Sequence, residues 1–426
     1  MEAYRQRVAD ILLRDRLEEV GAVLVEGSKW CGKTTTCEQQ AKSVLYMSDP
    51  EMQQQYSDLA NTQVKALLTG DTPRLIDEWQ LAPQLWDAIR FEVDHRSSHE
   101  GQFILTGSSV PVSTDRIKHS GAGRFAWLKM RPMSLYESGD STGEVSLESL
   151  FDPSVPVEGH NQMDLNRLAF LTCRGGWPAT LDKSERVALR TSYNYLDAVV
   201  NSDISRVDNV ARNPVWAEHL MRSYARLQGS QASAKVILDD MKASLSSESV
   251  SVQTVENYLT ALRKMFVVED LPAWSPNLRS KTAIRTSDTR YFVDPGIAAA
   301  AMRIGPKDLM NDLKTFGFLF ETLCIRDLRV YAEAIDGHVF HYRDKTELEC
   351  DAVIHLRNGQ YGLIEIKLGG DEAMAQGVKT LDALEAKINT EQMSKPAFKA
   401  VVTAVGSLAY RRQDGICVIP IGCLKL

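Results

Sequence analysis

A glycine-rich loop between an apolar strand and a helix constrains this chain more than any other feature. Ala22 to Glu26 is typical of a short strand, and the residues after the loop can start a helix. The pattern G-x-x-x-x-G-K-[ST] requires this setting, because its glycines let backbone N–H groups turn inward around a phosphate at a helix N-terminus. The residues that we expect around the phosphates are Gly27, Ser28, Lys29, Trp30, Cys31, Gly32, Lys33, Thr34 and Thr35.

A second apolar strand ends in two acids that suit a hydrolytic site. We expect the Lys33 ammonium to reach the β- and γ-phosphates of ATP, and the Thr34 hydroxyl to complete the shell of a Mg²⁺ ion. Residues 73–76 form the strand, and Asp77 and Glu78 follow it. Asp77 would hold Mg²⁺ through water, and Glu78 would polarise the attacking water. The paired acids favour ATP hydrolysis over the alternative of a P-loop kinase.

Further polar residues are candidates for contact with the γ-phosphate. The strand over residues 102–106 leads to Ser108, which could sense that phosphate from a neighbouring strand end. An arginine at the γ-phosphate neutralises charge in the transition state. We expect Arg124 to do this across a subunit boundary, with Arg131 as the second candidate. This role predicts a homo-oligomer, of which a ring is one form.

Composition limits the partners and the compartment. The 426 residues carry a net charge of −7, so DNA binding would need a local basic surface rather than the bulk field. No apolar run approaches the roughly 18 residues of a membrane span, and the N-terminus lacks a secretory signal. The seven cysteines form no C-x-x-C pair and are expected to be buried, reduced thiols. We therefore expect a cytoplasmic protein that does not enter a membrane.

The middle of the chain is predominantly helical in pattern. Residues 138–164 are rich in Ser, Gly, Glu and Pro and predict a loop or linker. Residues 165–227 predict a helical lid over the nucleotide. Two helices, a strand, a basic loop and a second strand follow, which is the order of a winged helix-turn-helix. Lys281 and Arg285 in that basic loop are candidate DNA phosphate contacts, although such modules also serve as dimerisation or spacer modules.

A β-hairpin in the last third carries the second candidate site. Its strands flank an Asn-Gly turn, and its register can be argued from burial. A two-residue loop would mix charged and apolar groups on each face. A three-residue loop, Arg357 to Gly359, with Gly359 left-handed, instead places Asp351 opposite Glu365 and leaves the other face apolar. Burial therefore selects the second register.

The selected register predicts a metal site. Opposed carboxylates of Asp351 and Glu365 repel unless a cation lies between them, and a divalent metal is the obvious candidate. Lys367 points the same way and could activate a water. Glu321 lies on the apolar stripe of a helix over residues 312–331, where a carboxylate is costly unless it is paired or binds metal. Such a group around Mg²⁺ can hydrolyse phosphodiesters; an exposed hairpin with ordinary Glu–Lys pairing is the alternative.

The chain resembles a known combination of domains. Gly27 to Thr34, Leu75 to Glu78, Gly123-Arg124 and residues 131–137 are similar to motifs of predicted prokaryotic AAA-type ATPases, as is Gly175 to Pro178. Residues 317–321, 342–343, 349–351 and 365–367 resemble the uncharacterised C-terminal domain that accompanies this ATPase. That domain looks like the PD-(D/E)xK nuclease fold of restriction endonucleases.

The predicted fold class is a multidomain α/β protein. It comprises an AAA-type ATPase core over 1–164, a helical lid over 165–227, a winged helix over 228–300, and a PD-(D/E)xK nuclease-like domain over 301–426. The resemblance implies ATP and Mg²⁺ as cofactors. We expect an ATP-driven protein that binds and processes DNA; the alternative is a non-cleaving regulatory or scaffold ATPase gated by nucleotide.

Overall fold

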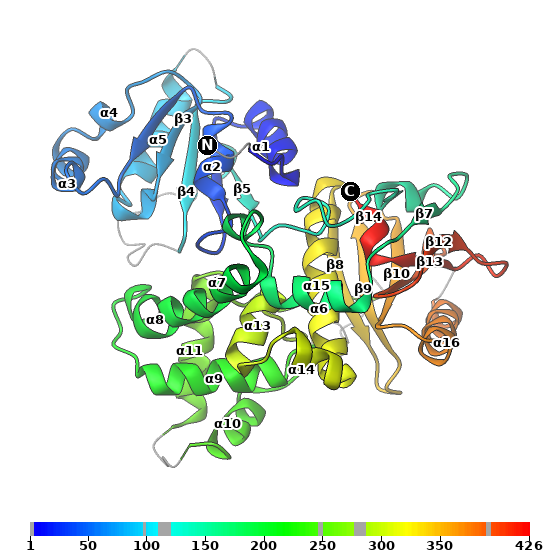
Figure 1. Ribbon diagram of the computed structural model, residues 1–426. Coiled ribbons are helices and arrows are strands. Elements are labelled where there is room, and N and C mark those ends of the chain that lie inside the picture. The colour runs from blue at the N-terminus through cyan, green and yellow to red at the C-terminus, as the bar shows by residue number, and fades with distance from the viewer. Residues whose placement is uncertain (1–3, 97–98, 110–120, 246–249, 277–286, 389–392) are drawn as a thin grey trace. The chain divides into compact units, whose positions relative to one another are not determined.

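The chain divides into two compact units, each made of segments that are separate in sequence (Figure 1). The computed structural model describes residues 4–96, 99–109, 121–245, 250–276, 287–388 and 393–426. The first unit comprises Met1–Pro132, Asn201–Arg212 and Thr260–Val267. The second comprises Met133–Val200, Asn213–Leu259 and Val268–Leu426.

A parallel sheet forms the centre of the first unit. Its strands, within the described residues, are β1 (Ala22–Glu26), β2 (Ser43–Tyr46), β3 (Arg74–Asp77), β4 (Phe103–Gly107) and β5 (Phe125–Lys129). They lie in the order β2, β3, β4, β1, β5. Because β4 lies between β1 and β3 and all run parallel, the carboxyl ends of these three strands meet at one edge of the sheet. That edge is where open α/β sheets bind ligands.

Helices cover both faces of this sheet. Successive strand residues point to opposite faces, and the buried clusters follow this rule. Leu13 and Leu17 pack with Val23 on one face, while Trp86 packs with Leu24 on the other. The helices are α1 (Val8–Glu19), α2 (Lys33–Glu38), α3 (Gln53–Thr62), α4 (Val64–Leu67) and α5 (Leu85–His95), with the 3₁₀ turn η1 (Trp79–Leu81). The three layers confirm an α/β fold for this unit.

A mixed sheet organises the second unit. Its described strands are β7 (Glu158–His160), β8 (Gly337–Arg343), β9 (Glu349–Leu356), β10 (Tyr361–Lys367), β11 (Phe398–Thr403), β12 (Leu408–Arg411) and β13 (Cys417–Pro420), in the order β7, β12, β13, β11, β10, β9, β8. Helix α16 (Asp371–Lys387) packs Leu381 and Leu384 on Val353 and Leu363. The long helix α15 (Leu313–Ala334) also contacts the sheet, at β8, β9 and β10.

The prediction of a loop or linker over residues 138–164 needs correction. It contains β6 (Val145–Ser146) and β7, and both pair with strands near the C-terminus. Strand β6 pairs with β14 (Leu424–Lys425), and β7 pairs with β12. The first unit therefore does not extend continuously to residue 164, because Met133–Val200 belongs to the second unit. Short 3₁₀ turns accompany these strands at η2 (Glu148–Phe151) and η5 (Ile421–Cys423).

The predicted lid over 165–227 is divided between the two units, since residues 201–212 belong to the first unit and its remaining residues to the second. Helices in and after this region are α6 (Leu165–Arg174), α7 (Glu185–Ala198), α8 (Ile204–Arg206), α9 (Pro214–Arg226), α10 (Ala234–Lys242), α11 (Val252–Lys264), α13 (Pro295–Met302) and α14 (Pro306–Asn311). The turn η3 (Pro178–Thr180) and the π-helix Val199–Asp203 complete the set of described helices.

The order expected of a winged helix is present in part. Helices α10 and α11 are followed by two antiparallel bridges, Val268 to Phe292 and Leu271 to Thr289. The candidate DNA contacts Lys281 and Arg285 lie outside the described residues.

Candidate functional site

The P-loop lies at the carboxyl edge of the first sheet, between β1 and α2. Gly27 has no room for a side chain, because an added Cβ would lie 2.0 Å from the carbonyl oxygen of Met130. Gly32 has a left-handed φ of 98° just before α2, which glycine adopts without steric cost. The two glycines of the motif are therefore required by the backbone.

Lys33 is folded into this loop and is nearly fully buried. Its Nζ donates hydrogen bonds of 2.9 Å to the carbonyl oxygens of both Gly27 and Ser28. These two contacts hold the ammonium inside the loop, where the motif requires it to meet phosphate oxygens.

Thr34 and Asp77 come together as the sequence predicts. Thr34 Oγ1 donates to Asp77 Oδ1 at 2.7 Å, and Thr106 Oγ1 donates to the same oxygen at 2.6 Å. A hydroxyl and a carboxylate are oxygen ligands of the kind that Mg²⁺ prefers. The residues present therefore fit a Mg²⁺ ion, which Thr34 would bind directly and Asp77 would hold through water.

Glu78 is held beside this pair by residues from its own turn and from the loop after β4. It has a left-handed φ of 57°. Ser108 Oγ donates to Glu78 Oε2 at 3.1 Å, and Gln80 Nε2 donates to the same oxygen. Ser108, predicted to sense phosphate, thus contacts the expected water-polarising carboxylate. Gln80 was not anticipated, because no motif marks it.

The variable residues of the P-loop differ in their surroundings. Lys29 forms an ion pair of 2.7 Å with Asp203. Trp30 is 49% exposed and has a left-handed φ of 66°. Cys31 is fully buried and donates to the Met130 carbonyl. Thr35 is exposed on α2.

The two arginine candidates lie at opposite edges of the sheet. Arg124 precedes β5, whereas Arg131 follows it, and β5 runs parallel to β1. Arg124 is thus at the amino edge, away from the P-loop of its own chain, and its Nε donates to Asp94 at 2.9 Å. Arg131 is close to the P-loop in the fold. The backbone N–H of the preceding residue, Met130, donates to the carbonyl oxygen of Glu26, which directly precedes the P-loop. Topology therefore excludes Arg124 as an arginine acting on its own subunit's nucleotide.

The hairpin of the second unit has the predicted register. Tyr361 pairs with His355 and Ile364 with Ala352, so that Asp351 lies opposite Glu365. Gly359 has a left-handed φ of 90° in the three-residue loop. The apolar pattern of one face was therefore sufficient to select the register.

Lys367 lies between the two opposed carboxylates. Its Nζ is 2.6 Å from Glu365 Oε2 and 3.0 Å from Asp351 Oδ2. Asp351 Oδ2 also accepts a hydrogen bond of 2.7 Å from the Ile366 backbone N–H. Burial, followed by the charge of Asp351, raises the pKa of Glu365 above its usual range. Burial disfavours the Lys367 ammonium, but both carboxylates outweigh it and raise the pKa of Lys367.

One oxygen of this cluster is available for a cation. Glu365 is 3% exposed, and its Oε1 has no hydrogen-bond partner within the described residues. A buried carboxylate oxygen without a partner is costly, and a divalent ion would satisfy it. Across the described ranges, no group of three or more His, Cys, Asp or Glu side chains is arranged to hold a metal. The residues thus fit a two-carboxylate Mg²⁺ site at Asp351 and Glu365, rather than a larger ligand cage.

Glu321 approaches this cluster from α15. The Tyr291 hydroxyl donates a hydrogen bond to Glu321 Oε1. Glu321 and Asp351 line the same pocket of about 30 Å³, together with His341. Burial, followed by the charge of Asp351, raises the pKa of Glu321. Tyr291 was not anticipated, because it lies in an apolar run that is typical of a core strand.

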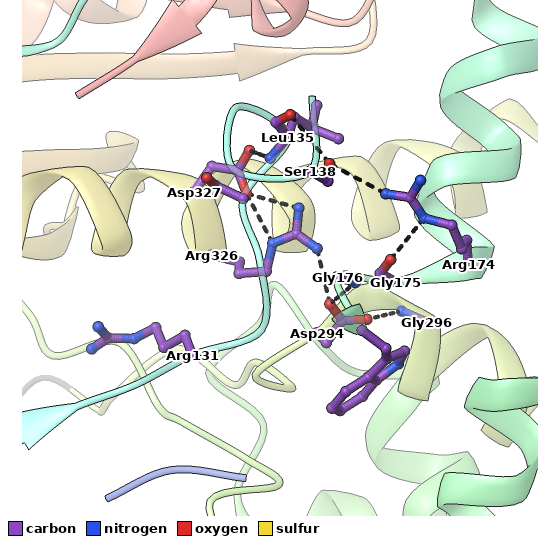
Figure 2. A network of polar contacts seen from close by, with 12 residues as sticks. Arg131, Leu135, Ser138, Arg174, Gly175, Gly176, Asp294, Gly296, Arg326 and Asp327 are labelled. Atoms are coloured by element: carbon purple, nitrogen blue, oxygen red, sulfur yellow. Dashed lines mark hydrogen bonds and ion pairs between the residues drawn. The ribbon is translucent and has the colours of Figure 1, made fainter. Parts of the chain in front are cut away.

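A buried ionic network fixes three further motifs within the second unit (Figure 2). Arg326 on α15 lies 2.9 Å from Asp294 Oδ2 and 2.8 Å from Asp327 Oδ1. Asp294 also accepts from the Gly176 backbone N–H, and Asp327 accepts from that of Leu135. The segment after residue 132, the Gly-Gly turn and α15 are therefore joined through buried charges.

Comparison with known proteins identifies the domain that contains the P-loop. Residues 20–139 match the family described as AAA domain. The first unit thus carries an AAA-type P-loop ATPase domain, and the protein is an ATPase. Residues 165–308 match a domain of unknown function, DUF8612, and residues 316–424 match another, DUF4143. A search of curated proteins found no match.

Two solved structures show distant similarity. A Walker-type ATPase of Pyrococcus abyssi is 14% identical with a TM-score of 0.42, over 71% of this chain and 96% of that chain. The Orc1 protein of Aeropyrum pernix, solved in complex with DNA, is 14% identical with a TM-score of 0.25, over 71% and 94%. These TM-scores are too low to assign a function. Among the described helices, none is long and apolar enough to cross a membrane.

Proposed function

We propose that this ATPase binds and processes DNA, and that its second unit carries a Mg²⁺-dependent phosphodiesterase site of the PD-(D/E)xK type. The observation that carries the proposal is the cluster of Asp351, Glu365 and Lys367 on one face of the hairpin, with a buried carboxylate oxygen that has no partner. A surface hairpin with ordinary ion pairing would not bury Glu365 to 3% exposure.

Each residue of this cluster has a separate task. Asp351 and Glu365 would hold Mg²⁺, which supplies Lewis-acid stabilisation of the phosphate charge. Lys367 Nζ, placed between both carboxylates, orients a water and keeps its positive charge beside the phosphate. Glu321, held by Tyr291, lines the same pocket as Asp351. Helices α10 and α11 with their bridged strands would form the winged-helix module that grips the DNA.

Replacing Asp351 with alanine tests this proposal. The variant should lose Mg²⁺- or Mn²⁺-dependent cleavage of single-stranded, linear and branched DNA in the presence of ATP, by roughly 10²-fold or more. Asp382→Ala is the matched control, since Asp382 forms an exposed ion pair with Lys399 in the same unit. The Asp382→Ala variant should cleave these substrates as wild type does.

The alternative is a non-cleaving regulatory or scaffold ATPase gated by nucleotide. The net charge of −7 favours it, as does the ion pairing of Lys367 with both carboxylates. Wild-type protein that leaves every DNA form uncut, as Asp351→Ala does, would refute the nuclease proposal. Failure to bind DNA even at low salt would favour the alternative, because phosphate contacts weaken steeply as salt rises.

We further infer that the ATPase works as a homo-oligomer in which Arg124 serves the neighbouring subunit's nucleotide. Arg124 lies at the wrong edge of the sheet for its own P-loop, and its side chain is 43% exposed. Its pairing with Asp94 is a surface contact, which is held weakly in water. A neighbouring nucleotide could therefore recruit it.

Mixing two inactive variants tests the shared site. Lys33→Ala and Arg124→Ala should each lose most ATP turnover alone, but a mixture should recover part of it. Recovery is expected because a Lys33→Ala subunit supplies Arg124 to the intact P-loop of its neighbour. The control mixes Arg124→Ala with a variant that carries both Lys33→Ala and Arg124→Ala. This mixture should not recover turnover, because neither subunit supplies Arg124. Absence of recovery in the first mixture would contradict the shared site.

A further inference from the structure

An exposed aromatic side chain lies beside the carboxylate pocket of the second unit. Phe318 is 39% exposed on α15, three residues before Glu321, so the two share a face of the helix. A Cβ added at Gly229 would lie 3.4 Å from Glu321 Oε1 and 3.5 Å from the Phe318 ring. The ring and the carboxylate are therefore neighbours on one surface.

The same face of α15 continues with a cation and an open position. Lys314 is exposed one turn before Phe318. Gly317 lies between them, and a Cβ placed there would meet no atom within 4 Å. The helix thus presents a row of a positive charge, an aromatic ring and a carboxylate that ends at the pocket of Asp351. This order matches phosphate, base and metal contacts along a nucleic-acid strand.

The backbone of Gly229 and Ser230, paired with Arg290, forms a wall beside this row. The backbone N–H of Gly229 donates to Arg290, and that of Arg290 donates to Ser230, both at 2.9 Å. Thr322 Oγ1 on α15 donates to Gln228 next to the wall at 3.0 Å. This last bond ties the wall to the helix. The pocket behind it, about 30 Å³, has room for an ion or one or two water molecules.

We propose that Phe318 stacks on one unpaired nucleobase, and that the Lys314–Phe318–Glu321 row leads a single DNA strand, rather than an intact duplex, to Asp351 and Glu365. The proposal rests on the proposed function in taking DNA as the substrate. Bases within a duplex have both faces covered by their neighbours, so only an unstacked base can cover the ring. Stacking of this kind tolerates any sequence, because every base has a π-face.

Binding without cleavage tests the proposal separately from the nuclease reaction. The probe is a fluorescein-labelled, mixed-sequence DNA strand of about 20 nucleotides, and its annealed duplex, with the full-length protein in a chelating buffer. Phe318→Ala should bind the single strand roughly 5- to 150-fold more weakly than wild type in anisotropy titrations. Phe318→Trp should retain affinity, since a larger ring still stacks.

Two controls make the result specific. Tyr410→Ala removes another exposed aromatic, 42% exposed on β12, and should bind as wild type does. The duplex should bind more weakly than the strand, and its affinity should not respond to Phe318→Ala. Equal binding of the strand by Phe318→Ala and wild type, equal losses on strand and duplex, or no binding of the strand by wild type would each overturn the proposal. If the strand binds in a Phe318-dependent way but is never cleaved, only the nuclease function is contradicted.

Discussion

Replacing Glu78 with glutamine is expected to slow ATP turnover by roughly 10²- to 10⁴-fold while ATP still binds. Glutamine keeps the shape of the side chain and can still accept from Ser108, but it lacks the carboxylate charge that polarises the attacking water. The P-loop contacts and the Thr34–Asp77 pair, which we expect to bind nucleotide and metal, do not involve Glu78. A selective loss of the chemical step should follow.

Phosphate release and nucleotide binding measured on the same preparation check this prediction. Glu38→Gln is the matched control. Glu38 is the last residue of α2, and its carboxylate accepts a hydrogen bond from the exposed Tyr46 hydroxyl. Its turnover should equal that of wild type. Wild-type turnover in Glu78→Gln would show that another group polarises the water.

Replacing Arg326 with methionine is expected to destabilise the second unit by about 3–5 kcal/mol. Arg326, Asp294 and Asp327 are all less than 4% exposed. Methionine fills part of the space but leaves two buried carboxylates without their cation, and removing one partner of a buried pair costs far more than the pair contributes. The segment from Leu135 and the turn at Gly176 would lose their anchors as well.

Urea unfolding, followed by tryptophan fluorescence, measures this effect. Trp177, fully buried in the second unit beside Tyr195, reports on the affected region. Arg412→Met removes a solvent-exposed pair with Asp414 and should shift the transition little. An unchanged transition for Arg326→Met would mean that the carboxylates find other partners.

The sequence predicted the parts of each site that local pattern determines. The P-loop residues and Asp77 follow from strand, loop and helix signals, and the structure brings Thr34 and Asp77 to 2.7 Å. The hairpin register follows from the two-residue period of strands and the Asn-Gly turn. In both cases the interacting residues lie on or next to elements that can be recognised from their sequence pattern.

Contacts made over long sequence separations were missed. Tyr291 contacts Glu321 from a segment that forms only isolated β-bridges, at Thr289 and Phe292. The strands β6 and β7 have two and three residues, too few to show a period, and they form only because β14 and β12 pair with them. Lys367, which was expected on this face to activate a water, supplies a positive charge between the carboxylates, where a divalent metal had been expected.

The placement of Arg124 could have been foreseen. A residue that precedes a strand parallel to β1 lies at the opposite edge from the residues that follow β1. That reasoning needs only the strand directions, and it leaves the choice between a shared site and Arg131 to experiment.

Steady-state phosphate release by the full-length wild-type protein, with ATP and Mg²⁺ and without any phosphoryl acceptor, tests the central claim most directly. An ATPase with Lys33, Thr34, Asp77 and Glu78 in these positions should release phosphate continuously, and chelation of Mg²⁺ should stop it. ATP bound without turnover, or turnover only when a small-molecule acceptor is added, would contradict the account.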